Sequence, residues 1–398
     1  MSDYLAIVRR QDCTGCGACS AICPRQCIAL NEDERGFRMP FFDLTICVNC
    51  GLCKKVCPVL NELNKEELQT PKLVVAAKNP NKLVAENSSS GGVFSILAEY
   101  VIEQHGAVYG VILNDELQAV HIRIDNAKGL YRLRGSKYLQ SDSSEIYPEV
   151  KKDLQSGKSV LFSGTPCQIA ALKQYLHRDF SNLICIAVVC HGVPSGLVFR
   201  EYVSALEIKY NSKIIGINFR DKSKGWGRNR ICFQFANGKQ YSQFGENNLL
   251  MQAYIKNLSI RDSCLNCKFK EFKSGADFIL GDLWGVEQIL PQYKVSNGVS
   301  MMCINTSKGI CVYNDIKNRL LDCDVISYED VKKYNACIYS SVKGHIKREE
   351  FLDNLNSLRI IPDLKMFLGI TRKTIIKTHI QQLKIKLVSF LVSIRGRI

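Results

Sequence analysis

Short apolar runs alternate with longer amphipathic stretches from residue 73 to residue 305. Runs in which most positions are apolar predict strands, and apolar residues spaced three or four apart predict helices. Strands that alternate with helices of these lengths are typical of a mixed α/β sheet. The expected strands are 73–77, 107–113, 118–124, 159–163, 183–189, 214–219, 231–235, 277–280 and 299–305, and the expected helices are 93–105, 147–155, 169–176, 197–210 and 249–258.

Two blocks of cysteines with identical spacing precede this region. Each reads C-x2-C-x2-C-x3-C-P, in which three thiolates of one block hold one 4Fe-4S cluster and the fourth reaches the neighbouring cluster. Zinc is usually held by two separated pairs, so it leaves the third cysteine and the proline of each block unexplained. A disulfide framework would need an exported chain. The expected ligand sets are Cys13, Cys16, Cys19 and Cys57 for one cluster and Cys47, Cys50, Cys53 and Cys23 for the other.

The first 60 residues therefore form a module of their own. Apolar runs at 28–30 and 37–41, separated by polar turn residues, predict two small strands that cover the clusters. Such a module buries little apolar surface, so metal binding supplies much of its folding free energy. Residues 61–71 are polar and end in proline, which predicts a linker. The expected fold is an α+β ferredoxin-like two-cluster module followed by a mixed α/β domain and a basic C-terminal helical tail.

The net charge of +15 is unevenly distributed. Residues 365–398 hold eight Lys and Arg and no acidic residue, so +8 lies in this tail and +7 in the rest. Each oxidised cluster with its thiolates adds about two negative charges, which offsets much of the remainder. No nucleic-acid motif is present, and we expect no nucleic-acid partner. Neither a secretory signal nor a membrane-spanning stretch occurs, and 19 cysteines favour a reducing compartment, so we expect a cytoplasmic protein.

The tail also carries an amphipathic pattern. Its apolar residues recur at helical spacing among basic ones, as in a helix that lies on a membrane surface. This predicts peripheral contact with the inner face of a membrane, and a helix that caps the core or covers a partner is the alternative. The apolar positions are Ile375, Ile376, Ile380, Leu383, Leu387, Phe390, Leu391 and Ile394.

Two polar segments are candidates for phosphate binding. Residues 88–92 (Ser-Ser-Ser-Gly-Gly) lie between a strand and the helix that opens at Val93, where free amides favour a phosphate or pyrophosphate. The alternative is an ordinary N-cap with a tight turn. Residues 134–141 combine a basic residue, a hydroxyl and an aromatic ring that could hold a ring and its phosphate, although short polar clusters of this kind usually face solvent.

Four further cysteines have marked local settings: Cys167, Cys190, Cys264 and Cys267. Two follow apolar strands, where sheet ends place side chains at a common edge. Four thiolates there could hold a further cluster or a zinc ion, and four separate buried cysteines are the alternative. The other seven are expected to be ordinary core residues: Cys27, Cys185, Cys232, Cys303, Cys311, Cys323 and Cys337.

Asp282 and Trp284 end a strand, where a carboxylate beside an indole can position a flat ligand. A tryptophan at a domain seam is the commoner explanation. The basic tryptophan loop at 222–230 could close over an anionic coenzyme.

Taken together, these motifs resemble, in order, those of the beta subunit of coenzyme F-420-reducing hydrogenases and dehydrogenases. The resemblance spans about residues 73–310, with the doubled cysteine module in front as in many bacterial members. The motifs are Gly-Gly-Val-Phe at 91–94, Gly-Ser-Lys-Tyr at 135–138, Gly-Thr-Pro-Cys-Gln at 164–168, Cys-His-Gly-Val-Pro at 190–194, the Cys264 and Cys267 pair, and Gly-Asp-Leu-Trp-Gly at 281–285.

The resemblance implies an N-terminal-type region at 72–155 and a C-terminal-type region at 156–345 with flavin and a third cluster. The helical basic tail, expected at 346–398, lies beyond the family motifs. The resemblance implies a third 4Fe-4S cluster on the four further cysteines. It also implies an FAD whose diphosphate is held by the serine loop and the 135–140 segment. The implied FAD-binding residues are Ser88, Ser89, Ser90, Gly91, Gly92, Ser136, Lys137, Tyr138 and Gln140.

The implied activity is hydride exchange between the flavin and the deazaflavin coenzyme F-420. A deazaflavin gives up two electrons at once and a cluster accepts one, so a flavin must lie between them. The N-terminal clusters would then exchange electrons with a ferredoxin or another electron-transfer subunit. Candidate catalytic residues are Lys137, His191 and Asp282. For His191, tuning of the cluster, proton relay and a plain structural role stay open.

A different class of function is a non-catalytic electron carrier or redox sensor, tied to surface-polysaccharide biosynthesis as bacterial relatives of this form often are. The 134–141 segment and the four further cysteines argue against a mere carrier, which would not need them. A radical S-adenosylmethionine enzyme is excluded, because C-x3-C-x2-C does not occur in the sequence.

Overall fold

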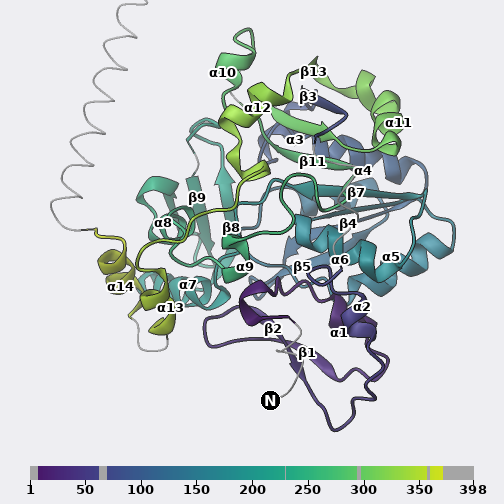
Figure 1. The fold of residues 1–398 in the computed structure, drawn as a ribbon. Coiled ribbons are helices and arrows are strands. Elements are labelled where there is room, and N and C mark those ends of the chain that lie inside the picture. The colour runs from purple at the N-terminus through teal and green to yellow at the C-terminus, as the bar shows by residue number, and fades with distance from the viewer. Residues whose placement is uncertain (1–7, 62–69, 229, 294–296, 356–358, 371–398) are drawn as a thin grey trace, which may run out of the picture.

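The computed structural model describes residues 8–61, 70–228, 230–293, 297–355 and 359–370 (Figure 1). Most of the expected linker and the whole of the expected amphipathic pattern at 375–394 lie outside these residues. No helix in the described ranges combines the length and hydrophobicity needed to cross a bilayer.

The N-terminal module consists of one hairpin and short helices, and it lies below the body in Figure 1. Strands β1 (Ile28–Glu32) and β2 (Arg38–Phe42) pair antiparallel, which confirms the two expected strands. Helices α1 (Ala18–Ile22) and α2 (Leu52–Lys55) each begin after a glycine in the left-handed conformation. These helices carry cysteines of the two blocks, so the glycines set the path of the chain where the ligands must converge. A single 3-10 turn, η1 (Arg10–Asp12), precedes the first block.

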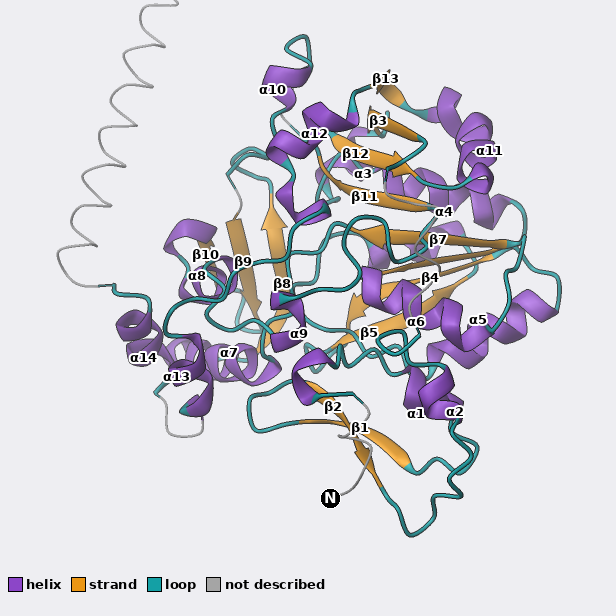
Figure 2. Ribbon diagram, in the orientation of Figure 1, coloured by secondary structure: helices purple, strands orange, loops and turns teal. Residues whose placement is uncertain are grey.

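The body is built on an eight-stranded sheet in the order β13-β3-β12-β11-β7-β6-β4-β5 (Figure 2). Its centre, β4-β6-β7-β11, is parallel, and the flanking strands pair antiparallel. The expected strands of this region are present, and the sheet is mixed as expected. The strands are β3 (Leu73–Lys78), β4 (Ala107–Leu113), β5 (Ala119–Ile124), β6 (Val160–Gly164), β7 (Leu183–Val188), β11 (Phe278–Asp282), β12 (Ser300–Ile304) and β13 (Leu321–Val325). Strands from both expected regions, 72–155 and 156–345, share this sheet.

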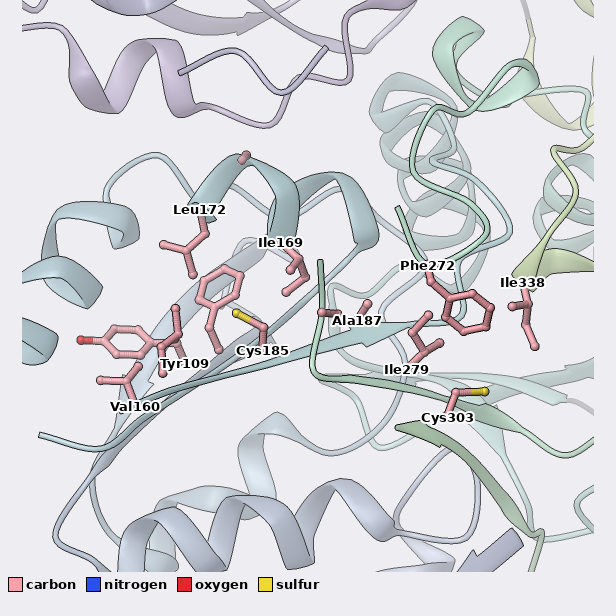
Figure 3. Packing of buried hydrophobic residues seen from close by; sticks show 14 of the residues in the cluster. Tyr109, Val160, Ile169, Leu172, Cys185, Ala187, Phe272, Ile279, Cys303 and Ile338 are labelled. Atoms are coloured by element: carbon pink, nitrogen blue, oxygen red, sulfur yellow. The ribbon is translucent and has the colours of Figure 1, made fainter. Parts of the chain in front are cut away.

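Helices cover both faces of the large sheet. Alternate residues of β6 show this, because Val160 and Phe162 face one core and Leu161 faces the other. In Figure 3, Ile169 and Leu172 of the covering helix lie over Val160 and Cys185. The first face is covered by α5 (Ile146–Gln155) and α6 (Pro166–Leu176), and the second by α4 (Val93–Glu103), α11 (Ser307–Ile316) and η2 (Ala127–Leu133).

A smaller antiparallel sheet, in the order β10-β9-β8, has its own core. Residues 348–353 and 360–367, expected as part of a helical tail, form two helices, and Ile360, Leu364 and Phe367 are buried in this core. That part of the chain is therefore integral to the fold. The elements are β8 (Ile214–Asp221), β9 (Arg230–Phe235), β10 (Gln240–Phe244), α7 (Gly196–Tyr210), α8 (Leu249–Ile255), α13 (Arg348–Asp353) and α14 (Ile360–Phe367). Helix α8 ends three residues before the expected end at 258.

Short elements complete the connections: α3 (Lys82–Glu86), α9 (Asp262–Leu265), α10 (Val286–Ile289), α12 (Tyr328–Tyr334), η3 (Gly245–Asn247), η4 (Lys317–Arg319) and η5 (Ala336–Ile338). None of these was predicted from the sequence, since all except α12 span five residues or fewer, too short to show a helical period.

Candidate functional site

The four cysteines of the first expected ligand set line one cavity, although Cys57 belongs to the second block. The crossing of the two blocks is therefore present in the fold. Burial first, and then the neighbouring Cys57 and Cys13, raise the pKa of the Cys16 thiol to about 12. A bound cation is what converts such buried thiols to thiolate ligands. We call Cys13, Cys16, Cys19 and Cys57 the inner set.

Three cysteines of the second expected set gather in a small cluster within the module. Cys23, Cys47 and Cys53 pack around the buried Cys27, and Cys50 is exposed. Cys27 is buried, as expected of a core cysteine, but its sulfur lies 3.3 Å from that of Cys23, so it contacts this set. We call Cys23, Cys47, Cys50 and Cys53 the outer set.

The four further cysteines also converge. Burial raises the pKa of Cys190 well above its ordinary value, and the charges of Cys264 and Cys167 raise it further. Cys167 lies in the first turn of α6, where Pro166 and the N-cap Thr165 fix the start of the helix. We call Cys167, Cys190, Cys264 and Cys267 the third set. In the described part of the chain, no three His, Cys, Asp or Glu side chains form a single-ion site.

The inner and third sets share one apolar wall. Cys13 and Cys57 of the inner set and Cys167 and Cys267 of the third pack against the same buried side chains. The wall consists of Val8, Val59, Ala170 and Phe269. The two sets are therefore neighbours across the junction of module and body.

Arg261 lies at this junction and is only 3 % exposed. Its guanidinium donates to the carbonyl of Cys13 (3.1 Å) and to that of Arg38 (2.8 Å). It also donates to Oε1 of Gln140 (2.8 Å), and no carboxylate of the described residues forms an ion pair with it. Burial raises the pKa of Cys13, and the charge of Arg261 opposes that rise. Arg261 is thus a buried cation between two thiol sets, which the sequence did not predict.

Gln140, expected at a flavin, faces the inner set instead. Its amide nitrogen donates to the carbonyls of Thr14 (2.8 Å) and Gly15 (2.9 Å), between Cys13 and Cys16. Tyr147 of α5 adds a further bond to this block, from its hydroxyl to the carbonyl of Cys16 (2.9 Å). These contacts fix the cysteine block to the body.

A cavity of about 410 Å³ lies between η2 and β8. Ser136 and Lys137 of the expected flavin segment line it, and Arg134 adds a second cation while the lining holds no acid. The sequence did not indicate the opposite wall, since β8 has the pattern of an ordinary strand. The remaining lining residues are Asn87, Tyr131, Gly135, Ile217, Asn218 and Phe219.

The serine loop adjoins this cavity, but its hydroxyls are engaged within the protein. The amide of Ser136 donates to Oγ of Ser89 (2.6 Å), and Oγ of Ser90 donates to the carbonyl of Val299 (2.9 Å). A Cβ at Gly91 would lie 2.7 Å from the amide nitrogen of Ser300, so only glycine fits there.

Lys137 is held by the end of η2. Its ammonium donates to the carbonyls of Arg134 (2.8 Å), Leu133 (3.3 Å) and Arg132 (3.3 Å). Burial lowers the pKa of Lys137 to about 8.

Asp282 is paired rather than open. It accepts from Nη1 of Arg220 (2.9 Å) and from Nε1 of Trp226 (3.0 Å). Trp226 stacks on Trp284 with ring centroids 4.8 Å apart. The basic tryptophan loop therefore closes on the strand end, and Lys222 of this loop donates to the carbonyl of Ser90 (2.7 Å).

His191 lies beside the third set. Its Nε2 donates to Oδ1 of Asn257 (2.7 Å), and its Nδ1 is 3.7 Å from the sulfur of Cys337. Burial lowers the pKa of His191, so the neutral ring is favoured. Cys337, expected to be an ordinary core residue, thus contacts a site residue.

Two tyrosines connect the cavity to the third set. The ring of Tyr138 lies edge-on to Phe219 in the cavity wall (5.6 Å) and stacks on Tyr254 (5.1 Å). Burial, followed by the charge of Cys190, raises the pKa of Tyr254 well above its ordinary value. Tyr138, expected to contact a flavin, lies behind the cavity wall.

Comparisons with known proteins identify relatives of this chain. Residues 157–332 match the family model for the C terminus of the beta subunit of coenzyme F420 hydrogenase/dehydrogenase, and residues 12–61 match the 4Fe-4S dicluster domain. The chain is 23 % identical over 278 residues to a subunit of the F(420)H(2) dehydrogenase from Methanosarcina mazei, covering 66 % of this chain and 72 % of that protein. A chain of the F420-reducing nickel-iron hydrogenase complex from Methanosarcina barkeri aligns with a TM-score of 0.47 and 16 % identity, over 74 % of this chain and 93 % of that chain.

Proposed function

This chain belongs to the coenzyme F-420 hydrogenase/dehydrogenase beta-subunit family, in a form that begins with a two-cluster 4Fe-4S domain, and we propose that it passes electrons between a hydride carrier and a one-electron partner protein through a bound FAD. It is an oxidoreductase of the iron-sulfur type. The hydride carrier that the family suggests is coenzyme F-420.

The observation that supports this most is that the cavity, the third set, the inner set and the outer set follow one another through direct contacts. The cationic cavity adjoins Phe219, Tyr138 and Tyr254, and these lead to the third set. The third set shares a wall with the inner set. Cys19 of the inner set packs in one cluster with cysteines of the outer set, whose Cys50 is exposed. A flavin is the group that exchanges hydrides on one side and single electrons on the other.

The residues at the inner set fit a cluster closely. A Cβ at Gly15 would lie 2.5 Å from the carbonyl of Arg38, so the chain there leaves no room for a side chain. Gly17 has a φ of +83°, which other residues rarely adopt. Four thiols around one cavity, with glycines between them, form the donor set and the close backbone that a 4Fe-4S cluster needs.

The cavity fits part of a flavin nucleotide. Its volume lies within the range of small-molecule sites, roughly 300–1,000 Å³. We assign Arg134, Lys137 and Ser136 to the phosphates, with the serine loop contributing backbone amides rather than hydroxyls. We assign Asp282, Gln140 and His191 positioning roles, because each is bonded to protein groups outside the cavity lining.

Iron and flavin analysis of protein purified without oxygen tests the proposal. We expect about twelve iron atoms, for three clusters, and one FAD per chain, and bleaching of the flavin by reduced coenzyme F-420. Iron without flavin, and no bleaching by any hydride donor, would contradict it and favour the electron-carrier alternative.

The third set is tested separately. Cys264→Ser should remove about four iron atoms and leave about eight. The matched control is Cys303→Ser, at a cysteine buried in the sheet core, which should keep all of the iron. Equal iron in the wild type and in Cys264→Ser would remove the third cluster from the proposal.

A further inference from the structure

The segment that leads to Cys50 of the outer set exposes several large apolar side chains. Val48 is 59 % exposed, Leu44 51 % and Phe41 48 %, and Ile46 lies among them. Large apolar residues gathered on a protein surface usually mark an interaction site. This cluster lies beside Cys50, the one exposed cysteine of the three sets. We call residues 41–50 together with α2 the outer-set surface.

Charges of mostly one sign border the same surface. Lys54 and Lys55 of α2 are exposed, and so is Arg25, which follows Cys23. Within the outer-set surface the only acid is Asp43, whose carboxylate accepts bonds from the amide (2.9 Å) and hydroxyl (2.6 Å) of Thr45. A basic rim around an apolar centre steers and selects a partner of negative charge.

We propose that the outer-set surface docks an acidic one-electron carrier protein that exchanges single electrons with the outer set. This rests on the proposed function, because it requires the outer set to hold a cluster. In each encounter the carrier loses or gains one electron and the outer set gains or loses it, with no bond made or broken.

A second copy of this chain fits the surface poorly, because two basic rims would face each other in a symmetric contact. A redox role also accounts for the exposed Cys50 two residues after Val48, since single-electron exchange requires close approach of the two centres. Binding to a membrane is an alternative occupant that the test includes.

The test measures how fast a chemically reduced, acidic two-cluster ferredoxin reduces the intact protein in stopped flow. The wild-type rate constant should fall steeply with added salt, because surface charges are screened beyond about 8 Å at physiological ionic strength. Lys54→Glu/Lys55→Glu should lower the rate constant at low salt by about tenfold or more. Lys128→Glu/Lys239→Glu makes the same change of charge on exposed residues of the body and should stay within about twofold.

A second test variant and its control address the exposed apolar residues. Val48→Asp should weaken the ferredoxin complex by about tenfold, since it places a charge in the middle of the contact. Ile208→Asp, at a position on α7 that is 79 % exposed, is the control and should change nothing. Iron content and complete reduction by dithionite establish that each variant carries its clusters.

The outcomes separate this proposal from the proposed function. Cluster-loaded protein that dithionite reduces, but whose reduction by ferredoxin is insensitive to salt, to Lys54→Glu/Lys55→Glu and to Val48→Asp, would overturn the docking surface alone. Binding to anionic vesicles that the Lys54→Glu/Lys55→Glu variant abolishes, without any effect on ferredoxin, would also overturn it. Protein without any cluster absorption would contradict the proposed function itself.

Discussion

The inner and outer cysteine sets have the same spacing in the sequence and opposite surroundings in the fold. The inner set is held by the body through Arg261, Gln140 and Tyr147. The outer set is held by the module, and Cys50 faces solvent. Identical ligand spacing therefore does not mean equivalent sites.

The difference has a functional meaning. The inner set lies next to the third set and beside a buried cation, which favours extra negative charge on a centre held there. The outer set lies where a partner protein can approach it. The module is thus oriented with one set toward the body and the other toward solvent, and the following predictions test this asymmetry.

Arg261→Met should have the largest effect. It removes a buried cation that donates to the carbonyls of Cys13 and Arg38 and to Oε1 of Gln140, and each such bond contributes about 1.5–3 kcal/mol. We expect a loss of several kcal/mol in stability. The reduction potential of the inner cluster should fall, because the reduced form loses a stabilising charge. Thermal unfolding and an optical redox titration measure the two effects.

Arg261→Lys is the matched control. Lysine keeps the positive charge but lacks the several donors of the guanidinium. Compared with Arg261→Met, the reduction potential of the inner cluster should therefore recover more than the stability does. A potential of the outer cluster that shifts as much as that of the inner one in Arg261→Met would contradict the asymmetry.

Gln140→Ala should have an intermediate effect. It removes two bonds to the carbonyls of Thr14 and Gly15 and one acceptor of Arg261, which costs about 1–3 kcal/mol because these buried groups lose their partner. Flavin content should be unchanged, since Gln140 faces the inner set. Loss of flavin with intact iron would show instead that the sequence-based assignment of Gln140 to the flavin is right.

Gln140 illustrates where sequence reasoning ends. The cysteine sets were predictable, because ligand spacing is local within each block and the crossing of Cys57 follows from cluster geometry. Of the residues that line the cavity, only those of the polar segment 134–141 were predictable. Ser136 and Lys137 belong to a polar segment, whereas Ile217 and Phe219 are strand residues that tertiary structure brings opposite them. Arg261 follows no motif, and its role comes entirely from where the module docks.

The fold shows the same limit. Strand 183–189 was predictable because a strand at the centre of the sheet is apolar throughout, and β7 spans Leu183–Val188. Strands β10 (QYSQF) and β13 (LDCDV) were missed, because both lie at the edge of a sheet and are largely solvent-facing. Edge strands carry polar residues that periodicity cannot distinguish from loops.

The smallest effect concerns two glycines in equivalent places, and it tests the asymmetry most directly. Gly17 and Gly51 precede α1 and α2 in the left-handed conformation, with φ of +83° and +73°. Alanine at either position costs about 1 kcal/mol from backbone strain. At Gly51 a Cβ would meet nothing within 4 Å, so Gly51→Ala should cost only this strain.

At Gly17 the same Cβ would lie 3.0 Å from Cβ of Ser144, in the body of the protein, so the neighbouring chain must move as well. Gly17→Ala should therefore lose more stability than Gly51→Ala, by about 1 kcal/mol or more, since overpacking usually costs about 1–3 kcal/mol. Unfolding of the two cluster-loaded variants, followed by loss of cluster absorption, measures the difference. The backbone strain and the position before a helix are the same at both glycines. Equal losses of stability in the two variants would therefore mean that the contact between Gly17 and Ser144 of the body leaves room for a side chain.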